Sequence, residues 1–151
     1  MSTETPTKLP KSAAPFNNQA HVEIYSSAPG TGHTRVPDVL EVKNHLNTVH
    51  AGALFTLGEI AAARAVVTAL GDDIARLTAL TRRAEIRYLK PAQGAIEARA
   101  TLGTTRDDIL RAVEAEGRTR ASVEVKLTDA AGVVVAEMEV DWHIARPKEK
   151  S

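Results

Sequence analysis

The second half of the chain alternates apolar and polar residues over four stretches. In each stretch every second side chain is apolar, which is typical of strands with one buried and one solvated face in an antiparallel sheet. These predicted strands cover residues 84–88, 96–102, 121–127 and 134–144. Weaker strand candidates precede them at residues 21–26 and 34–43, and Pro37 interrupts the second. Turns are predicted at residues 90–94, which contain a proline and a glycine, and at residues 129–132, which contain an aspartate and a glycine.

Residues 51–70 show a different pattern, because they are apolar on nearly every side. The stretch AGALFTLGEIAAARAVVTAL is rich in alanine and leucine, contains no proline and precedes Gly71, a residue type that commonly ends helices. Glu59 and Arg64 are its only charged residues. Since a helix that is apolar all round belongs inside a fold, we predict a long buried helix here.

A second, shorter helix is predicted at Arg106–Ala115, with Thr104 or Thr105 as its N-cap. The predicted order is therefore two strands, a buried helix, two strands, a small helix and two strands. A strongly curved sheet around the long helix is the simplest arrangement that buries all the apolar faces. The fold class is α+β.

Composition narrows the possible functions. The 151 residues are 43% apolar and 25% charged, the balance of a globular protein. Nineteen basic and nineteen acidic residues give a net charge of zero. The chain therefore lacks the excess positive charge that is typical of nucleic-acid-binding proteins. Without cysteine, thiol catalysis, disulfides and a cysteine zinc site are excluded. The histidines lack metal-ligand spacing, so no metal is expected.

The ends of the chain differ from its middle. Residues 1–14 are rich in Thr, Ser, Pro and Lys and read as a disordered tail, and residues 147–151 read as a second, short tail. One folded domain is expected over residues 15–146. We find no signal-peptide stretch and no apolar run of transmembrane length, so a cytoplasmic protein without membrane association is expected.

The candidate chemistry lies around the start of the long helix. The first turn, at Ala51 and Gly52, presents backbone N–H groups that can stabilise an oxyanion, and Glu59 follows two turns later. One group that polarises a carbonyl and one that activates water make a layout for acyl transfer. From the residues alone, Glu59 can equally face solvent or pair with Arg64 or with an arginine across a dimer interface.

Residues 44–59, NHLNTVHAGALFTLGE, resemble the signature of the phenylacetic-acid-type hotdog thioesterases, within the 4-hydroxybenzoyl-CoA thioesterase-like superfamily. That signature has an asparagine, a histidine six residues later, two small residues, and an Asp or Glu fifteen residues after the asparagine. Residues 88–94, YLKPAQG, resemble a second marker of the family. The similarity covers residues 16–144 and is greatest to a largely uncharacterised subgroup. It implies a hotdog fold, a curved antiparallel sheet wrapped around a long central helix.

The resemblance also implies roles for individual residues. Glu59 would be the general base or nucleophile, and the Ala51 amide, beside Gly52, the oxyanion donor. Asn44 would orient water or substrate, His50 would hold the loop and the thioester end, and Thr81 would assist the attacking water. The residues alone leave other readings open: His50 as a helix cap, Asn44 as a turn cap. Ala51 departs from the family's usual first glycine, and Ala63 stands where some relatives place a threonine.

The implied function is hydrolysis of an acyl-CoA or carrier-bound thioester, with no metal or redox cofactor and with coenzyme A only as part of the substrate. Hydration or dehydration of an acyl thioester is an alternative, since His45 precedes Glu59 by the fourteen residues that hotdog dehydratases use. A non-catalytic acyl-CoA-binding protein is another. Because such sheets have open edges, we expect a two-fold dimer or a tetramer with each active site at an interface.

Overall fold

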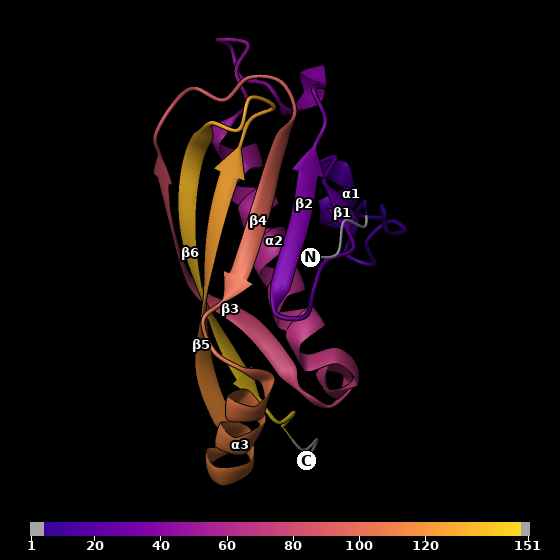
Figure 1. Cartoon of the computed structure of the whole chain (residues 1–151), viewed down its shortest axis with the longest axis vertical. Helices are drawn as coiled ribbons and strands as arrows, with labels where there is room; N and C mark the ends of the chain where they lie inside the picture. Colours follow the sequence, from indigo (N-terminus) through magenta and orange to yellow (C-terminus); the bar gives the residue numbers. More distant parts are fainter. Residues whose placement is uncertain (1–4, 149–151) are drawn as a thin grey trace.

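The computed structural model describes residues 5–148, and its centre is one sheet of six antiparallel strands (Figure 1). The strands are β1 (Glu23–Tyr25), β2 (Thr31–Val36), β3 (Thr78–Tyr88), β4 (Ile96–Leu102), β5 (Arg118–Thr128) and β6 (Val134–Ala145). Their order across the sheet is β1-β2-β4-β5-β6-β3, so β1 and β3 form its two edges. The helices are α1 (Pro15–Gln19), α2 (Ala51–Leu70) and α3 (Arg106–Glu116), with 3-10 turns η1 (Leu40–Val42) and η2 (Gly71–Arg76).

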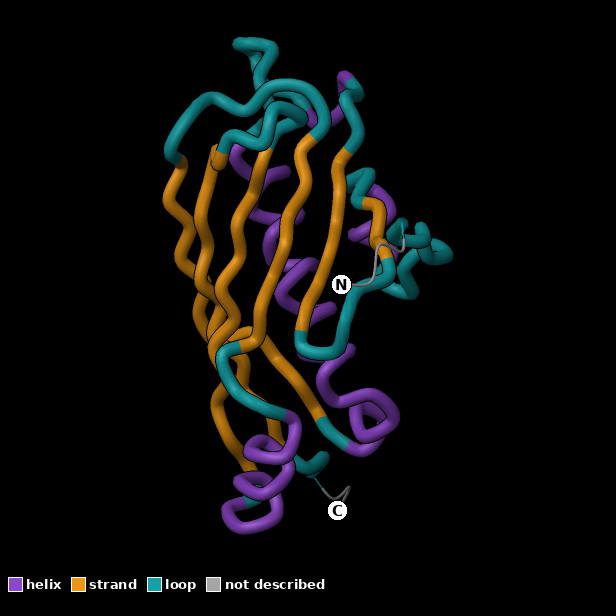
Figure 2. The backbone as a smooth tube through the Cα atoms, viewed as in Figure 1, coloured by secondary structure: helices purple, strands orange, loops and turns teal. Residues whose placement is uncertain are grey.

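Helix α2 lies along one face of the sheet, while α3 lies beyond the lower end of β4 (Figures 1 and 2). The apolar side chains that the strands direct toward α2 form the core, and this arrangement confirms the predicted α+β fold, a sheet around a long helix. The segment Ala51–Arg76 is long and apolar enough to cross a membrane, but it is the core helix of this fold.

The ends of α2 follow from its sequence. The imidazole of His50 caps the first turn, and Gly71, with φ of 55°, ends the helix. Leu54, Leu57 and Ala61 are buried against the sheet. The hydroxyl of Thr34 in β2 donates a hydrogen bond of 2.9 Å to the carbonyl of Leu57, which ties strand to helix.

Several boundaries differ from the sequence predictions. The predicted strand at residues 34–43 is wrong beyond Val36, because Pro37 cannot continue the ladder and the chain turns into η1. Strand β3 begins at Thr78, six residues before the alternating pattern, since pairing with β6 decides its start. Helix α1 was not predicted. Thr105 is the cap of α3, one of the two predicted positions.

The described part of the predicted N-terminal tail lies against β1. The amide of Leu9 donates to the carbonyl of Ile24 at 2.8 Å, and the amide of Ser26 donates to the carbonyl of Thr7 at 2.8 Å. Lys8 forms an ion pair with Glu23 at 2.5 Å. Residues 7–9 are thus held at the edge of the sheet in this structure. The rest of the predicted tails, residues 1–4 and 149–151, lies outside the described residues.

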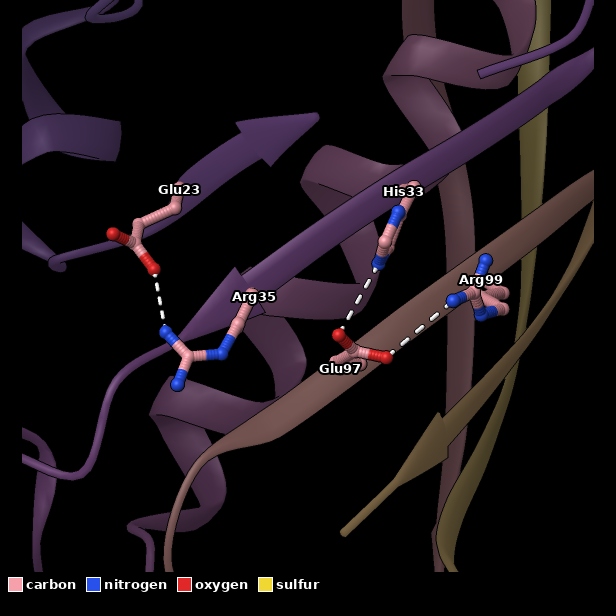
Figure 3. A network of polar contacts seen from close by, with 5 residues as sticks. All are labelled: Glu23, His33, Arg35, Glu97 and Arg99. Atoms are coloured by element: carbon pink, nitrogen blue, oxygen red, sulfur yellow. Dashed lines mark hydrogen bonds and ion pairs between the residues drawn. The ribbon is translucent and has the colours of Figure 1, made fainter. Parts of the chain in front are cut away.

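A polar network occupies the sheet near β1, and it contains Glu23, His33, Arg35, Glu97 and Arg99 (Figure 3). Within it, His33 is only 5% exposed and stacks on the ring of Tyr25, with centroids 5.1 Å apart. Its Nε2 lies 3.5 Å from Oε1 of Glu97. Burial, and secondly the Arg99 guanidinium, hold the pKa of His33 below its ordinary value, so the ring is neutral near pH 7.

Candidate active site

Glu59 and Thr81 meet across two elements that are far apart in the sequence. Glu59 is half-buried on α2, and Thr81 is exposed on the edge strand β3. The hydroxyl Oγ1 of Thr81 donates a hydrogen bond of 3.1 Å to Oε1 of Glu59. Glu59 forms no ion pair within residues 5–148, and the possible pair with Arg64 is not formed. The structure therefore brings these two predicted site residues together.

A β-bulge in β3 accompanies this contact. Thr81 is opposite Trp142 of β6, but Arg83 is opposite Asp141, so Arg82 is an extra residue in β3. Directly opposite residues in an antiparallel pair point to the same face of the sheet. Since Trp142 is buried in the core, Thr81 points to the helix-facing side, where Glu59 lies. The bulge bends the strand at the site, a common use of bulges.

The start of α2 carries the predicted oxyanion donors. Nδ1 of His50 accepts a hydrogen bond of 2.8 Å from the Gly52 amide, so this amide is occupied and does not match its predicted role. Because Nδ1 accepts, the neutral ring carries its proton on Nε2, a donor at an exposed position. The Ala51 amide has no hydrogen-bond partner among the described residues. The hydroxyl of Tyr88 donates to the Ala51 carbonyl at 3.0 Å, which joins β3 to the helix start.

Asn44 holds a turn together. Its Oδ1 accepts from the amides of Leu46 and Thr48, at 3.0 and 3.1 Å, and its Nδ2 donates to the Thr48 hydroxyl at 2.8 Å. Asn47, in the same turn, adopts a positive φ of 62°. This is the turn-capping role that the sequence left open. Asn44 makes no hydrogen bond to Glu59 in the described part of the chain.

Ala51 and Glu59 are too far apart within one chain to act on one carbonyl. Eight residues along an α-helix correspond to about 12 Å, whereas a hydrogen bond to a reacting atom requires about 3 Å. The side chain of a helical glutamate leans toward the N-terminus, which shortens the gap by only a few ångströms. The chain therefore carries two half-sites: a carboxylate with a hydroxyl, and a capped helix terminus with one unpaired amide.

The residues around these half-sites do not form a metal centre. Within residues 5–148, no group of three or more His, Asp or Glu side chains is arranged to hold a metal ion. The chemistry available is that of a carboxylate, a hydroxyl, an imidazole and a backbone amide. This set can take up a proton and stabilise an oxyanion.

Comparisons with known proteins agree with the fold. A family model described as "Domain of unknown function (DUF4442)" matches residues 6–144. A solved structure of a Pseudomonas aeruginosa protein of unknown function, described as a probable thioesterase, is 28% identical over 87% of each chain, with a TM-score of 0.79. No protein among the curated sequences matches.

Two further solved structures show the same fold at lower identity. A mutant of the phenylacetic acid degradation protein PaaI from Thermus thermophilus is 21% identical over 86% of this chain and 98% of its own, with a TM-score of 0.68. A mutant thioesterase enzyme from Staphylococcus aureus is 17% identical over 87% of this chain and 98% of its own, with a TM-score of 0.71. The matches confirm the predicted hotdog fold.

Proposed function

We propose that this chain, which belongs to the DUF4442 family within the hotdog-fold thioesterase superfamily, hydrolyses thioesters of acyl groups carried by coenzyme A or a related carrier. The observation that carries the proposal is the hydrogen bond between Thr81 and Glu59. It orients a carboxylate that has no cationic partner in residues 5–148, on the outward side of the helix. A carboxylate in that state is available as a base.

In the proposed reaction, Glu59 accepts a proton from a water molecule as its oxygen attacks the thioester carbonyl carbon. Thr81 holds Oε1 of the carboxylate, so Oε2 faces the water. The carbonyl oxygen becomes an oxyanion that the Ala51 amide and Nε2–H of His50 stabilise. When the intermediate collapses, the carbon–sulfur bond breaks and the thiolate takes the proton from Glu59. The products are a carboxylic acid and a thiol.

The proposed site needs two subunits. Since Ala51 and Glu59 of one chain lie about 12 Å apart along the helix, Glu59 and Thr81 would act with Ala51 of the partner subunit. Strand β3 supports this, because it is an eleven-residue edge strand that carries the exposed Leu80 and ends beside Ala51. Unpaired edges favour strand pairing between subunits. We propose a two-fold dimer, alone or paired into a tetramer.

The test is Glu59→Gln, assayed by thiol release from a series of acyl-CoA substrates. The amide keeps the size of the side chain and can still accept from Thr81, but it cannot act as base or nucleophile. We expect a rate loss on the order of a hundredfold to ten-thousandfold with little change in melting temperature. Glu114→Gln, at an exposed carboxylate on helix α3, is the control and should leave the rate unchanged.

Three results would contradict the proposal. Near-wild-type hydrolysis by folded Glu59→Gln would remove Glu59 from the mechanism. Hydration of enoyl-CoA without hydrolysis would favour the dehydratase alternative, and saturable acyl-CoA binding without turnover would favour a binding protein.

A further inference from the structure

The two phenylalanines of the chain lie in one cleft. The sequence has only two, and both are solvent-accessible, with Phe16 67% and Phe55 36% exposed. They line a cleft of about 480 Å³ between α1, η1 and the first turns of α2. Ala20, Val42 and Ala53 complete its apolar wall. Its volume lies in the range of small-molecule pockets, roughly 300–1,000 Å³.

The cleft adjoins the helix-start half of the proposed site. His50 and Gly52 line it at the start of α2. Residues three or four apart on a helix share a face, so Gly52, Phe55 and Glu59 follow one another on the outward side of α2. A Cβ at Gly52 would meet Nδ1 of His50 at 3.1 Å, so the close approach of the capping imidazole favours glycine at this position. A group bound between the phenylalanines thus extends from the helix start, where the thioester carbonyl is proposed to bind.

The charges at the rim decide which part of the substrate fits. Glu41 lines the cleft and is exposed, and Lys43 lines it with its ammonium group 2.7 Å from the carboxylate of Asp38. Asp38, which lies outside the lining, neutralises Lys43, and the carboxylate of Glu41 has no ion-pair partner among residues 5–148. The rim therefore disfavours the phosphates of coenzyme A and any acyl group that ends in a carboxylate. The uncharged, apolar end of the substrate fits both the rim and the wall.

We propose that this cleft, the Phe16–Phe55 cleft, binds the acyl group, and that Phe16 and Phe55 select substrates whose acyl group is an uncharged alkyl or aryl group. This inference rests on the proposed thioester hydrolysis. Phe16 comes from α1, before the sheet, and Phe55 from the core helix. Acyl selectivity is thus assigned jointly to the core helix and to a short helix that the alternating pattern of the chain does not predict.

The experiment compares kcat/KM of wild type, Phe16→Ala and Phe55→Ala with acetyl-CoA, octanoyl-CoA, phenylacetyl-CoA and succinyl-CoA. The wild type should prefer the octanoyl and phenylacetyl substrates and reject succinyl-CoA. Each variant should lose about tenfold or more with the two apolar substrates, since lost apolar contacts in a pocket typically cost that much, and several-fold less with acetyl-CoA. Phe55→Leu, which keeps an apolar side chain, should retain most of the preference. Val133→Ala is the matched control, because Val133 is as exposed as Phe55 but lies in the turn before β6.

An equal loss with every substrate would overturn the inference, because the cleft would then hold the part common to all of them. An unchanged acyl preference would also overturn it. So would a change of oligomeric state in light scattering without a change of preference, since a second copy would then cover the cleft.

Binding of octyl-CoA, a thioether that cannot be hydrolysed, separates this inference from the proposed function. Calorimetry should show that octyl-CoA binds the wild type more tightly than coenzyme A and that Phe16→Ala loses this advantage. If that result holds while no thioester is hydrolysed, the cleft stands and the hydrolase proposal fails. If Glu59-dependent hydrolysis is found but octyl-CoA has no advantage, the hydrolase stands and the cleft assignment fails.

Discussion

Replacing Gly32 with alanine should destabilise the protein strongly, because β2 and α2 lie very close at this position. A Cβ added at Gly32 would lie 1.9 Å from the carbonyl oxygen of Ala61 in α2, and real Cβ contacts are essentially never below 3.0 Å. The obstacle is helix backbone, which has no alternative rotamer. Strand and helix would have to separate by at least about 1 Å, along the surface where the hydroxyl of Thr34 ties β2 to α2.

The expected cost follows from overpacking in other cores, where extra methyl groups cost roughly 1–3 kcal/mol and occasionally more. Because backbone must move, we expect Gly32→Ala to lie at the upper end, about 3 kcal/mol. For a domain of this size that lowers the melting temperature by roughly 6–12 °C. Moving α2 also displaces Glu59 relative to Thr81, so the proposed hydrolysis should weaken even where the variant is folded.

Urea denaturation, followed by circular dichroism, measures the change in the free energy of unfolding. Gly58→Ala is the matched control: its Cβ would lie 2.7 Å from Sδ of Met138, the end of a flexible side chain that can rotate away. Alanine also stabilises a helix interior by roughly 0.5–1 kcal/mol over glycine, which offsets part of the crowding. Gly58→Ala should therefore cost much less than Gly32→Ala. A loss below about 1 kcal/mol for Gly32→Ala, or equal losses for both, would refute the argument.

Three further outcomes can be measured on stability alone. The buried carboxylate of Asp73 accepts hydrogen bonds from Arg106 and Arg76, and these bonds hold the pKa of Asp73 below its ordinary value. Asp73→Asn should therefore destabilise the protein at pH 7. In urea titrations, the difference in unfolding free energy between this variant and wild type should shrink as the pH falls below about 4. Because the pKa of His33 is lowered in the folded state, the stability that its neutral ring contributes should be lost as the pH falls below about 6.5. His33→Gln should therefore flatten the dependence of unfolding free energy on pH between pH 6.5 and 5. Identical pH dependences for variant and wild type would exclude this role of His33. Deleting residues 1–11 removes the backbone hydrogen bonds to Ile24 and Ser26, and we expect a cost of about 1–3 kcal/mol by calorimetry. An unchanged melting temperature would instead support the detached tail expected from the sequence.

The elements that the sequence predicted well are those whose pattern is local. The apolar stretch before Gly71 determines α2, and strict alternation determines most of β4, β5 and β6. Local signals were insufficient where pairing decides the outcome. The first residues of β3 are paired with β6 without alternating, and the docking of Leu9 on Ile24 depends on an edge that exists only once the sheet has formed.

The same division holds for the candidate site. Glu59, His50 and Ala51 could be named from spacing along one helix, and the resemblance added Thr81. The sequence alone therefore determined the fold class and the central helix, and it named candidates for the proposed chemistry, because these follow from periodicity and from short-range spacing. Only the tertiary structure decided that Thr81 hydrogen-bonds Glu59, that His50 occupies the Gly52 amide, and that Phe16 and Phe55 share a cleft. Each of these contacts depends on side-chain direction and on segments brought together by packing, and neither is encoded in the order of residues along any single element.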